Sequence, residues 1–166
     1  MNPLDILKKL LKDQARLKYP SMPEHALKIN TFDTFKPEKR EKKRIEAFLL
    51  ASGHYAAIIE NRGQRKDNRE VVTDVLGRQK VIGTVEFIGS GMRRGLADVK
   101  SMIKGVPIDI ELKRIYKNGK DRQSDHQKLE QERVENAGGQ YWIVNSFEDF
   151  HEKYEFYLKR LASNIT

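Results

Sequence analysis

The stretch that most constrains this chain runs from residue 95 to 113 and reads GLADVKSMIKGVPIDIELK. Lys104 and Gly105 separate two runs of alternating side chains, which predicts a two-stranded hairpin with a two-residue turn. That turn sets Lys100 opposite Asp109. Because successive side chains of a strand point to opposite faces, one face of the hairpin is apolar and suited to a core. This face carries Val99, Ser101, Ile108, Ile110 and Leu112.

The other face of the hairpin is charged and places Asp98 opposite Glu111. Like charges directly across a ladder repel each other, so the two carboxylates either share a proton or bind a cation. Oxygen ligands at this spacing suit Mg²⁺, which one or two carboxylates hold together with water and phosphate. Lys113 points to the same side, where an ammonium could hold a water or meet charge on a phosphate. The alternative is that these are solvated charges on the open face of an antiparallel sheet.

The remaining patterns predict a mixed α/β fold with one central sheet flanked by helices. Apolar spacing predicts helices over residues 3–17, 38–52 and 124–137 and from Phe147 onward. Strands are expected at 55–59, 71–76, 81–88, 96–103, 106–113 and 141–144, with loops at 61–69, 89–95 and 114–123. Three prolines between residues 20 and 37 indicate a linker. We therefore expect an N-terminal helix and arm over residues 1–37 and a main domain over residues 38–166.

Charge and composition narrow the function classes. The 166 residues carry a formal net charge of +8 and no cysteine, which excludes disulfides, thiolate zinc sites and cysteine nucleophiles. No apolar run approaches the ~20 residues of a membrane span, and lysines interrupt the leucines of the N-terminus where a secretory signal would be apolar. We expect a cytoplasmic protein that does not enter a membrane. The surplus of positive charge suggests a polyanionic partner, nucleic acid first, although a basic surface alone is the plainer interpretation.

The ordered series of motifs resembles that of a known family. Asp98, twelve intervening residues and then Glu111-Leu-Lys113 resemble the PD-(D/E)XK nuclease motif, and the wider context resembles its VRR-NUC branch. Ala97 departs from the pattern, since a proline usually stands there. The resemblance covers residues 38–150, and its further features are Asn61-Arg-Gly63, Gly95-Leu-Ala-Asp98, Gly105, Gly119-Lys120, Ser124-Asp-His-Gln127, Gly138-Gly139-Gln-Tyr141 and Ser146-Phe-Glu-Asp-Phe150.

The resemblance implies a restriction-endonuclease-like core that binds Mg²⁺ or Mn²⁺. Asp98, Glu111 and the main-chain carbonyl of Leu112 would be metal ligands, and Lys113 would position the attacking water. Gln127 matches a helical glutamine near the active site of the family, although Ser124 and Gln127 also form a capping box. An acid from the helix at 38–52 often joins the site, with Glu41 the best match and Glu46 and Glu38 as rivals.

The resemblance further implies a metal-dependent DNA endonuclease, similar to phage enzymes that resolve Holliday junctions as homodimers. Its substrate would be branched or duplex DNA. The alternative is a catalytically inert DNA-binding module that keeps the nuclease fold. Cations on the predicted loops are candidates for contacts with DNA phosphates. They are Arg62, Arg65, Lys66, Arg93, Arg94, Arg114, Lys117 and Lys120.

Overall fold

The computed structural model describes residues 2–60, 64–89, 91–113, 115–116, 119–120 and 122–163. The chain divides into two compact units, one formed by Met1–Ile59 with Gly95–Thr166 and the other by Glu60–Arg94. This division differs from the boundary expected at residue 37. The N-terminal helix belongs to the larger unit because its Leu7 side chain is fully buried in the hydrophobic core of that unit.

A four-stranded sheet organises the larger unit in the order β1-β6-β7-β10. Its strands are β1 (Tyr55–Ile58), β6 (Val99–Ile103), β7 (Val106–Leu112) and β10 (Gln140–Val144). β6 runs antiparallel to β1 and β7, whereas β10 runs parallel to β7. A parallel neighbour requires a crossover connection, and the helix between β7 and β10 supplies it. The mixed sheet flanked by helices agrees with the predicted fold class.

The predicted hairpin register is confirmed. Lys100 lies opposite Asp109 and Ile103 lies opposite Val106. Lys104 and Gly105 both have positive φ, at 51° and 82°, as a two-residue hairpin turn that follows the twist of its strands requires. A local turn thus fixes which side chains of β6 and β7 face each other.

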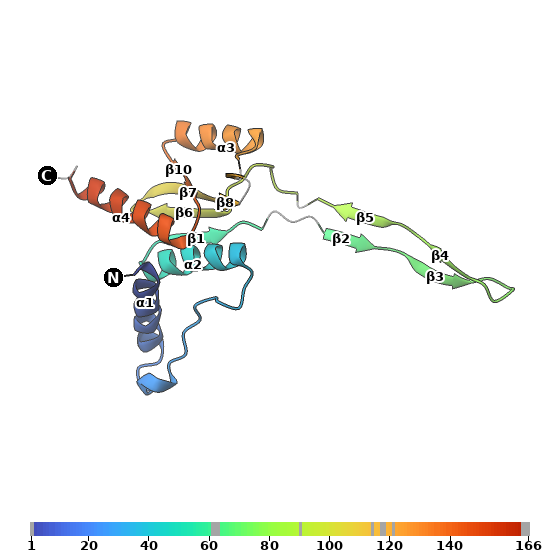
Figure 1. The fold of residues 1–166 in the computed structure, drawn as a ribbon, viewed down its shortest axis with the longest axis horizontal. Coiled ribbons are helices and arrows are strands. Elements are labelled where there is room, and N and C mark those ends of the chain that lie inside the picture. Colours follow the sequence, from blue (N-terminus) through green and yellow to red (C-terminus); the bar gives the residue numbers. More distant parts are fainter. Residues whose placement is uncertain are drawn as a thin grey trace. The chain divides into compact units, whose positions relative to one another are not determined.

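Helices cover both faces of the sheet (Figure 1). α1 (Pro3–Lys18), α2 (Pro37–Ala51) and α4 (Phe147–Ser163) pack on one face, and α3 (Asp125–Asn136) lies over the other. A short 3₁₀ helix, η1 (Glu24–Ala26), follows α1. The core between the sheet and helices α1, α2 and α4 contains Phe48. This ring makes edge-to-face contacts with Phe147, Phe150 and Tyr154. Such aromatic pairs add about 0.5–1.5 kcal/mol each beyond the burial of their area.

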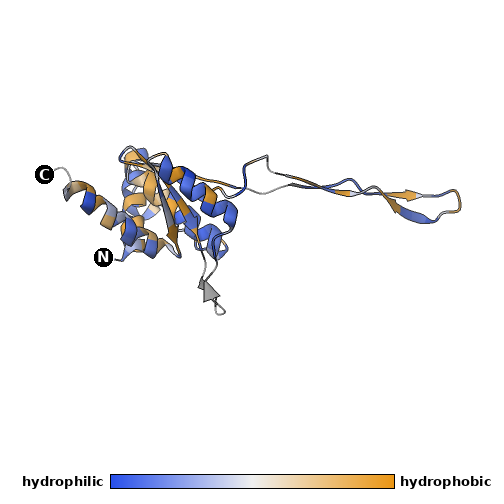
Figure 2. Cartoon of the chain, turned by 90° about the horizontal axis from the view of Figure 1, so that it is seen from above, coloured by the Kyte–Doolittle hydropathy of each residue, from blue (hydrophilic) through white to orange (hydrophobic). Residues whose placement is uncertain are grey.

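The smaller unit is a two-stranded antiparallel ribbon. β2 (Gln64–Asp67) pairs with β5 (Val85–Ile88), and β3 (Glu70–Thr73) pairs with β4 (Gln79–Ile82). Both pairs share one register, and the Asn68 N–H donates to the Thr84 carbonyl between them at 3.1 Å. Figure 2 shows hydrophobic residues along these strands.

The expectation that this segment joins the central sheet is wrong. Its strands pair with each other because a tight local turn brings them together. The Asp74 side chain stabilises that turn by accepting the N–H groups of Leu76 and Arg78, both at 2.8 Å. Two segments that were expected to be loops also contain short strands. The segment 61–69 contains β2, and the segment 114–123 contains the paired strands β8 (Ile115–Tyr116) and β9 (Gly119–Lys120).

Candidate functional site

The charged face of the hairpin is buried. Asp109, Glu111 and Lys113 are only 4%, 4% and 8% exposed, because α3 covers this side of the sheet. The interpretation as solvated charges on an open sheet face is therefore wrong. Asp109 has an ordinary structural partner, since Lys100 Nζ lies 2.6 Å from its Oδ2. Glu111 and Lys113 remain as buried charges that this pair does not explain.

Asp98 lies beside Glu111 at the end of the hairpin. It directly precedes β6, and its Oδ2 accepts the Leu112 N–H at 3.0 Å. On the neighbouring strand, the Ile59 N–H donates to the Asp98 carbonyl at 2.8 Å. The main-chain N–H groups of Ile59, directly after β1, and of Leu112 in β7 therefore fix Asp98 between them. The structure brings together Asp98, Glu111 and Lys113, as the sequence predicts.

Gln127 connects the start of α3 to this pair of carboxylates. Its Oε1 accepts from the Ser124 N–H and from Lys113 Nζ, both at 2.9 Å. Its Nε2 donates to Glu111 Oε1 at 2.5 Å. The capping box of Ser124 and Gln127 is confirmed, so one side chain serves the helix start and the site together. Both roles that the sequence suggests for Gln127 are compatible.

Gly95 allows α3 to approach the hairpin this closely. It has a φ of +90°, and a Cβ atom at this position would lie 2.3 Å from the carbonyl oxygen of His126. A side chain would collide with backbone, which cannot move without shifting the first turn of α3. The glycine before Asp98 is therefore needed for the position of Gln127.

The electrostatics single out Glu111. Burial, followed by the charge of Asp98, raises its pKa from 4.5 to about 7, while Lys113 and Lys42 act in the opposite direction. Within the described part of the chain, Glu111 Oε2 is buried with no hydrogen-bond partner. An ionised carboxylate in this state is costly. A cation at this oxygen would satisfy it.

Tyr141 is a neighbour of the site that the sequence analysis placed in a strand and in a motif but not among the site residues. It is the β10 residue opposite Asp109, so its side chain lies on the charged face. Burial and the charges of Glu111, Asp109 and Asp98 raise its pKa above the ordinary value for tyrosine. The phenol is therefore neutral and can donate a hydrogen bond.

Lys42 is a site residue that the sequence analysis missed. Its Nζ lies 2.5 Å from Asp98 Oδ1 and 2.8 Å from Glu38 Oε1. Burial opposes the charge of Lys42, yet hydrogen bonds to Asp98 and Glu38 raise its pKa. The i,i+4 spacing of Glu38 and Lys42 was the available signal, but it does not reveal that Asp98 completes the contact.

The structure does not bring Glu41 to Asp98 and Glu111, in contrast to the expectation. Its Oε2 accepts the N–H of Phe147 at the start of α4, at 2.9 Å, and its Oε1 lies 2.9 Å from Arg40 Nε. A carboxylate that satisfies a helix N-terminus is stabilised by the helix dipole. Of the three candidate acids on α2, Glu38 is the one that connects to the site, through Lys42.

The predicted DNA-binding cations are only partly described. Arg65, Lys66, Arg93 and Arg94 belong to the smaller unit. Arg65 lies 3.5 Å from Asp67 and makes an ion pair within the ribbon. Arg62, Arg114 and Lys117 lie outside the described residues, and for Lys120 only the backbone, in β9, is described.

The site offers a metal ion two carboxylate side chains, those of Asp98 and Glu111. Among the residues that the structure describes, no three His, Cys, Asp or Glu side chains converge to hold a metal ion. Two carboxylates are nevertheless enough for Mg²⁺, which keeps several waters and takes few protein ligands. The unpartnered Glu111 Oε2 beside Asp98 fits such an ion.

Comparison with protein-family models, with curated proteins and with solved structures found no match to this chain. Across the described residues, no helix has the length and apolar character needed to cross a membrane.

Proposed function

We propose that this protein is a Mg²⁺- or Mn²⁺-dependent DNA endonuclease that hydrolyses phosphodiester bonds in branched DNA. The observation that carries the proposal is the buried Glu111 carboxylate, which lies beside Asp98 and Lys113 and has one oxygen with no hydrogen-bond partner among the described residues. An apolar residue at this position would make the fold more stable, since an isolated buried charge is costly. The carboxylate therefore points to a role other than stability. The resemblance to VRR-NUC nucleases gives the same assignment to the same three residues.

Asp98, Glu111 and the carbonyl of Leu112 would hold the ion in this proposal. A bound divalent cation supplies Lewis-acid polarisation of the phosphodiester. Lys113 positions the attacking water and meets the charge that develops on the phosphate. Gln127 holds the Lys113 ammonium at 2.9 Å and Glu111 at 2.5 Å, so it orients both groups toward one point.

A catalytically inert DNA-binding module is the second candidate. One observation favours it, because the Lys42 ammonium already neutralises Asp98 at 2.5 Å. If Lys42 and Lys113 are the permanent partners of the two carboxylates, then no metal is required. In that case the protein would bind branched DNA equally well with Mg²⁺ and with EDTA, and it would cleave none.

The test is cleavage of labelled four-way junctions, flaps and linear duplexes with Mg²⁺. We expect the wild type to cut branched DNA, and Glu111→Gln and Lys113→Met each to lose about 100-fold or more in rate, as for other electrostatic catalytic groups. The matched control is Asp109→Asn, a buried acid two residues from Glu111 that pairs with Lys100. If Glu111→Gln cuts as fast as the wild type, the site is wrong.

A further inference from the structure

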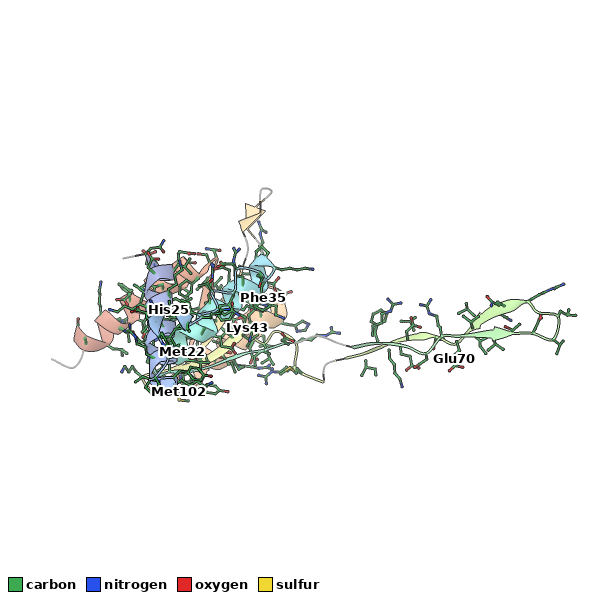
Figure 3. All side chains as sticks on the ribbon, turned by 90° about the horizontal axis from the view of Figure 1, so that it is seen from below. Met22, His25, Phe35, Lys43, Glu70 and Met102 are labelled. Carbon is green, nitrogen blue, oxygen red and sulfur yellow. The ribbon has the colours of Figure 1, made fainter. Side chains whose placement is uncertain are left out.

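The ribbon of the smaller unit exposes apolar side chains that nothing in the described chain covers. Six examples are Val71, Val75, Leu76, Val81, Phe87 and Ile88, whose exposures range from 50% to 102%. In Figure 3, where Glu70 marks the ribbon, side chains extend from both of its sides. An isolated two-stranded hairpin is marginally stable in water. These features indicate that the ribbon is stabilised by a partner.

The outer edge of the ribbon formed by residues 64–73 can pair with another strand. Asn68 bonds inward to Thr84, and Asp74 bonds inward to Arg78. Since inward and outward bonding alternate in an antiparallel ladder, the odd-numbered residues of this edge direct their backbone groups outward. One of these groups, the Arg69 N–H, is held by Asp67 Oδ1 at 3.2 Å. Strand edges whose backbone groups face outward are templates for strand addition.

The charges of the ribbon point to a protein partner rather than a polyanion. Between residues 64 and 89 there are five Lys or Arg residues and four Asp or Glu residues. Asp67 pairs with both Arg65 and Arg69, so it offsets part of this basic charge. A nearly balanced charge favours a partner with charges of both signs over a polyanion, because phosphate binding depends on many unpaired cations.

We propose that two copies of this chain dimerise by pairing their 64–73 edges antiparallel about a two-fold axis at Asn68. This register sets Lys66 opposite Glu70 of the second copy and Asp67 opposite Arg69 of the second copy. The symmetry repeats each pair, which gives four oppositely charged pairs. It also places Asp67 and Arg69, whose backbone groups face outward, in a pair that exchanges main-chain hydrogen bonds. The Arg69 N–H, which donates to Asp67 Oδ1 of its own chain, would then donate to the main-chain carbonyl of Asp67 in the second copy.

The opposite edge of the ribbon is less suited to this pairing. A two-fold axis there passes through Gly83, whose φ of +103° departs from strand conformation. The Gly83 backbone also sits against the Asn68 carbonyl, 2.3 Å from where a Cβ would lie. In addition, only Lys80 and Glu86 form a charged pair across that axis. The 64–73 edge, which is interrupted only at Asn68 and Arg69 between β2 and β3, therefore has the more complementary charge.

The absence of cysteine from the chain allows a direct test. Asn68→Cys places one thiol of each copy next to the axis, in a pair that does not exchange main-chain hydrogen bonds. The Cα atoms of such a pair are ~4.5 Å apart, within the range that a disulfide spans. We expect this variant to form a covalent dimer under mild oxidation. In the matched control, Thr73→Cys, the two thiols are ten residues out of register, or ~33 Å apart, and no covalent dimer should form.

Sedimentation of the full chain supplies the second measurement. We expect a wild-type dimer, and we expect Lys66→Glu to weaken dimerisation at least tenfold. The double variant Lys66→Glu/Glu70→Lys restores the opposite charges across the axis and should dimerise like the wild type. A monomeric wild type at 100 µM overturns the proposal, and so does equal crosslinking of the two cysteine variants. None of these readouts depends on nuclease activity, so the proposal and the proposed function can fail separately.

Discussion

Glu111 shows how one residue can act against the stability of its own fold. Its side chain is 95% removed from solvent, and the nearest positive group, Lys113 Nζ, lies 3.3 Å from Oε1. This contact does not offset burial and the charge of Asp98, which together raise the pKa to about 7. The folded chain therefore holds a proton at Glu111 under conditions in which the unfolded chain has released it.

The raised pKa of Glu111 predicts how stability depends on pH. Between pH 4.5 and about 7 the folded state binds more protons than the unfolded state, so stability falls as pH rises. The shift corresponds to about 3 kcal/mol across this window. We expect Glu111→Gln to flatten the dependence, because the amide keeps the shape without the charge. Urea unfolding at several pH values between 5 and 8.5, without divalent cations, measures the two slopes. Equal slopes for wild type and variant would contradict the assignment.

Lys42 competes with a divalent cation for Asp98. Lys42→Met removes the ammonium at Asp98 Oδ1, and we expect Mg²⁺ to bind about fivefold to tenfold more tightly, which corresponds to ~1 kcal/mol. Isothermal titration of Mg²⁺ into each variant measures this change. The matched control is Lys43→Met on the same helix, since Lys43 pairs with Glu46 at 2.8 Å. Unchanged affinity in Lys42→Met would show that Mg²⁺ does not use this oxygen.

At the scale of elements, the first turn of α3 combines a structural and a functional role. The capping box between Ser124 and Gln127 stabilises the helix start, and the crossover from β7 to β10 places that start over the charged face of the sheet. Gly95 permits the close approach. The same side chain of Gln127 then reaches Glu111 and Lys113.

Two variants separate these roles of α3. Ser124→Ala removes the hydroxyl that accepts the Gln127 N–H at 3.3 Å, which should cost about 1 kcal/mol of stability as for other N-caps. It should leave the cleavage rate within a few-fold of the wild type. Gln127→Ala should lower the rate at least tenfold, because Glu111 and Lys113 lose their common partner. Urea unfolding and cleavage rates measured on both variants separate the capping role from the positioning role. Equal effects of the two variants on cleavage would refute a positioning role for Gln127.

At the scale of the molecule, the two units differ in what stabilises them. The hydrophobic core is built from α1, α2, α4 and the four-stranded sheet, all in the larger unit. In the ribbon of residues 64–88, by contrast, Val71, Val81 and Phe87 are each more than half exposed. Stability of the larger unit should therefore not depend on the ribbon.

Replacement of residues 64–88 by a short Gly-Ser linker tests this independence. We expect the melting temperature of the larger unit to change by only a few degrees, since no buried core residue is lost and shortening a loop has a small entropic effect. Circular dichroism with thermal melts measures it. A loss of cooperative unfolding would mean that the ribbon contributes to the core.

Local patterns explain which parts of the fold could be predicted. Lys104-Gly105 and the alternation around it fix the β6–β7 register, and Ser124-x-x-Gln127 fixes the start of α3. The strands with which residues 64–88 pair could not be predicted from such local patterns. Their alternation is consistent both with the central sheet and with a separate ribbon, and contacts distant in sequence decide between them.

The sequence by itself determined that Asp98, Glu111 and Lys113 share one face of a hairpin, because turn chemistry and strand alternation act over a few residues. Only the tertiary structure decided that this face is buried, that Lys42 meets Asp98 and that Glu41 instead satisfies the start of α4. Burial, long-range charge and helix placement depend on elements far apart in the chain. They turn a row of charged side chains into a site in which one Glu111 oxygen is buried with no partner in the part of the chain that the structure describes.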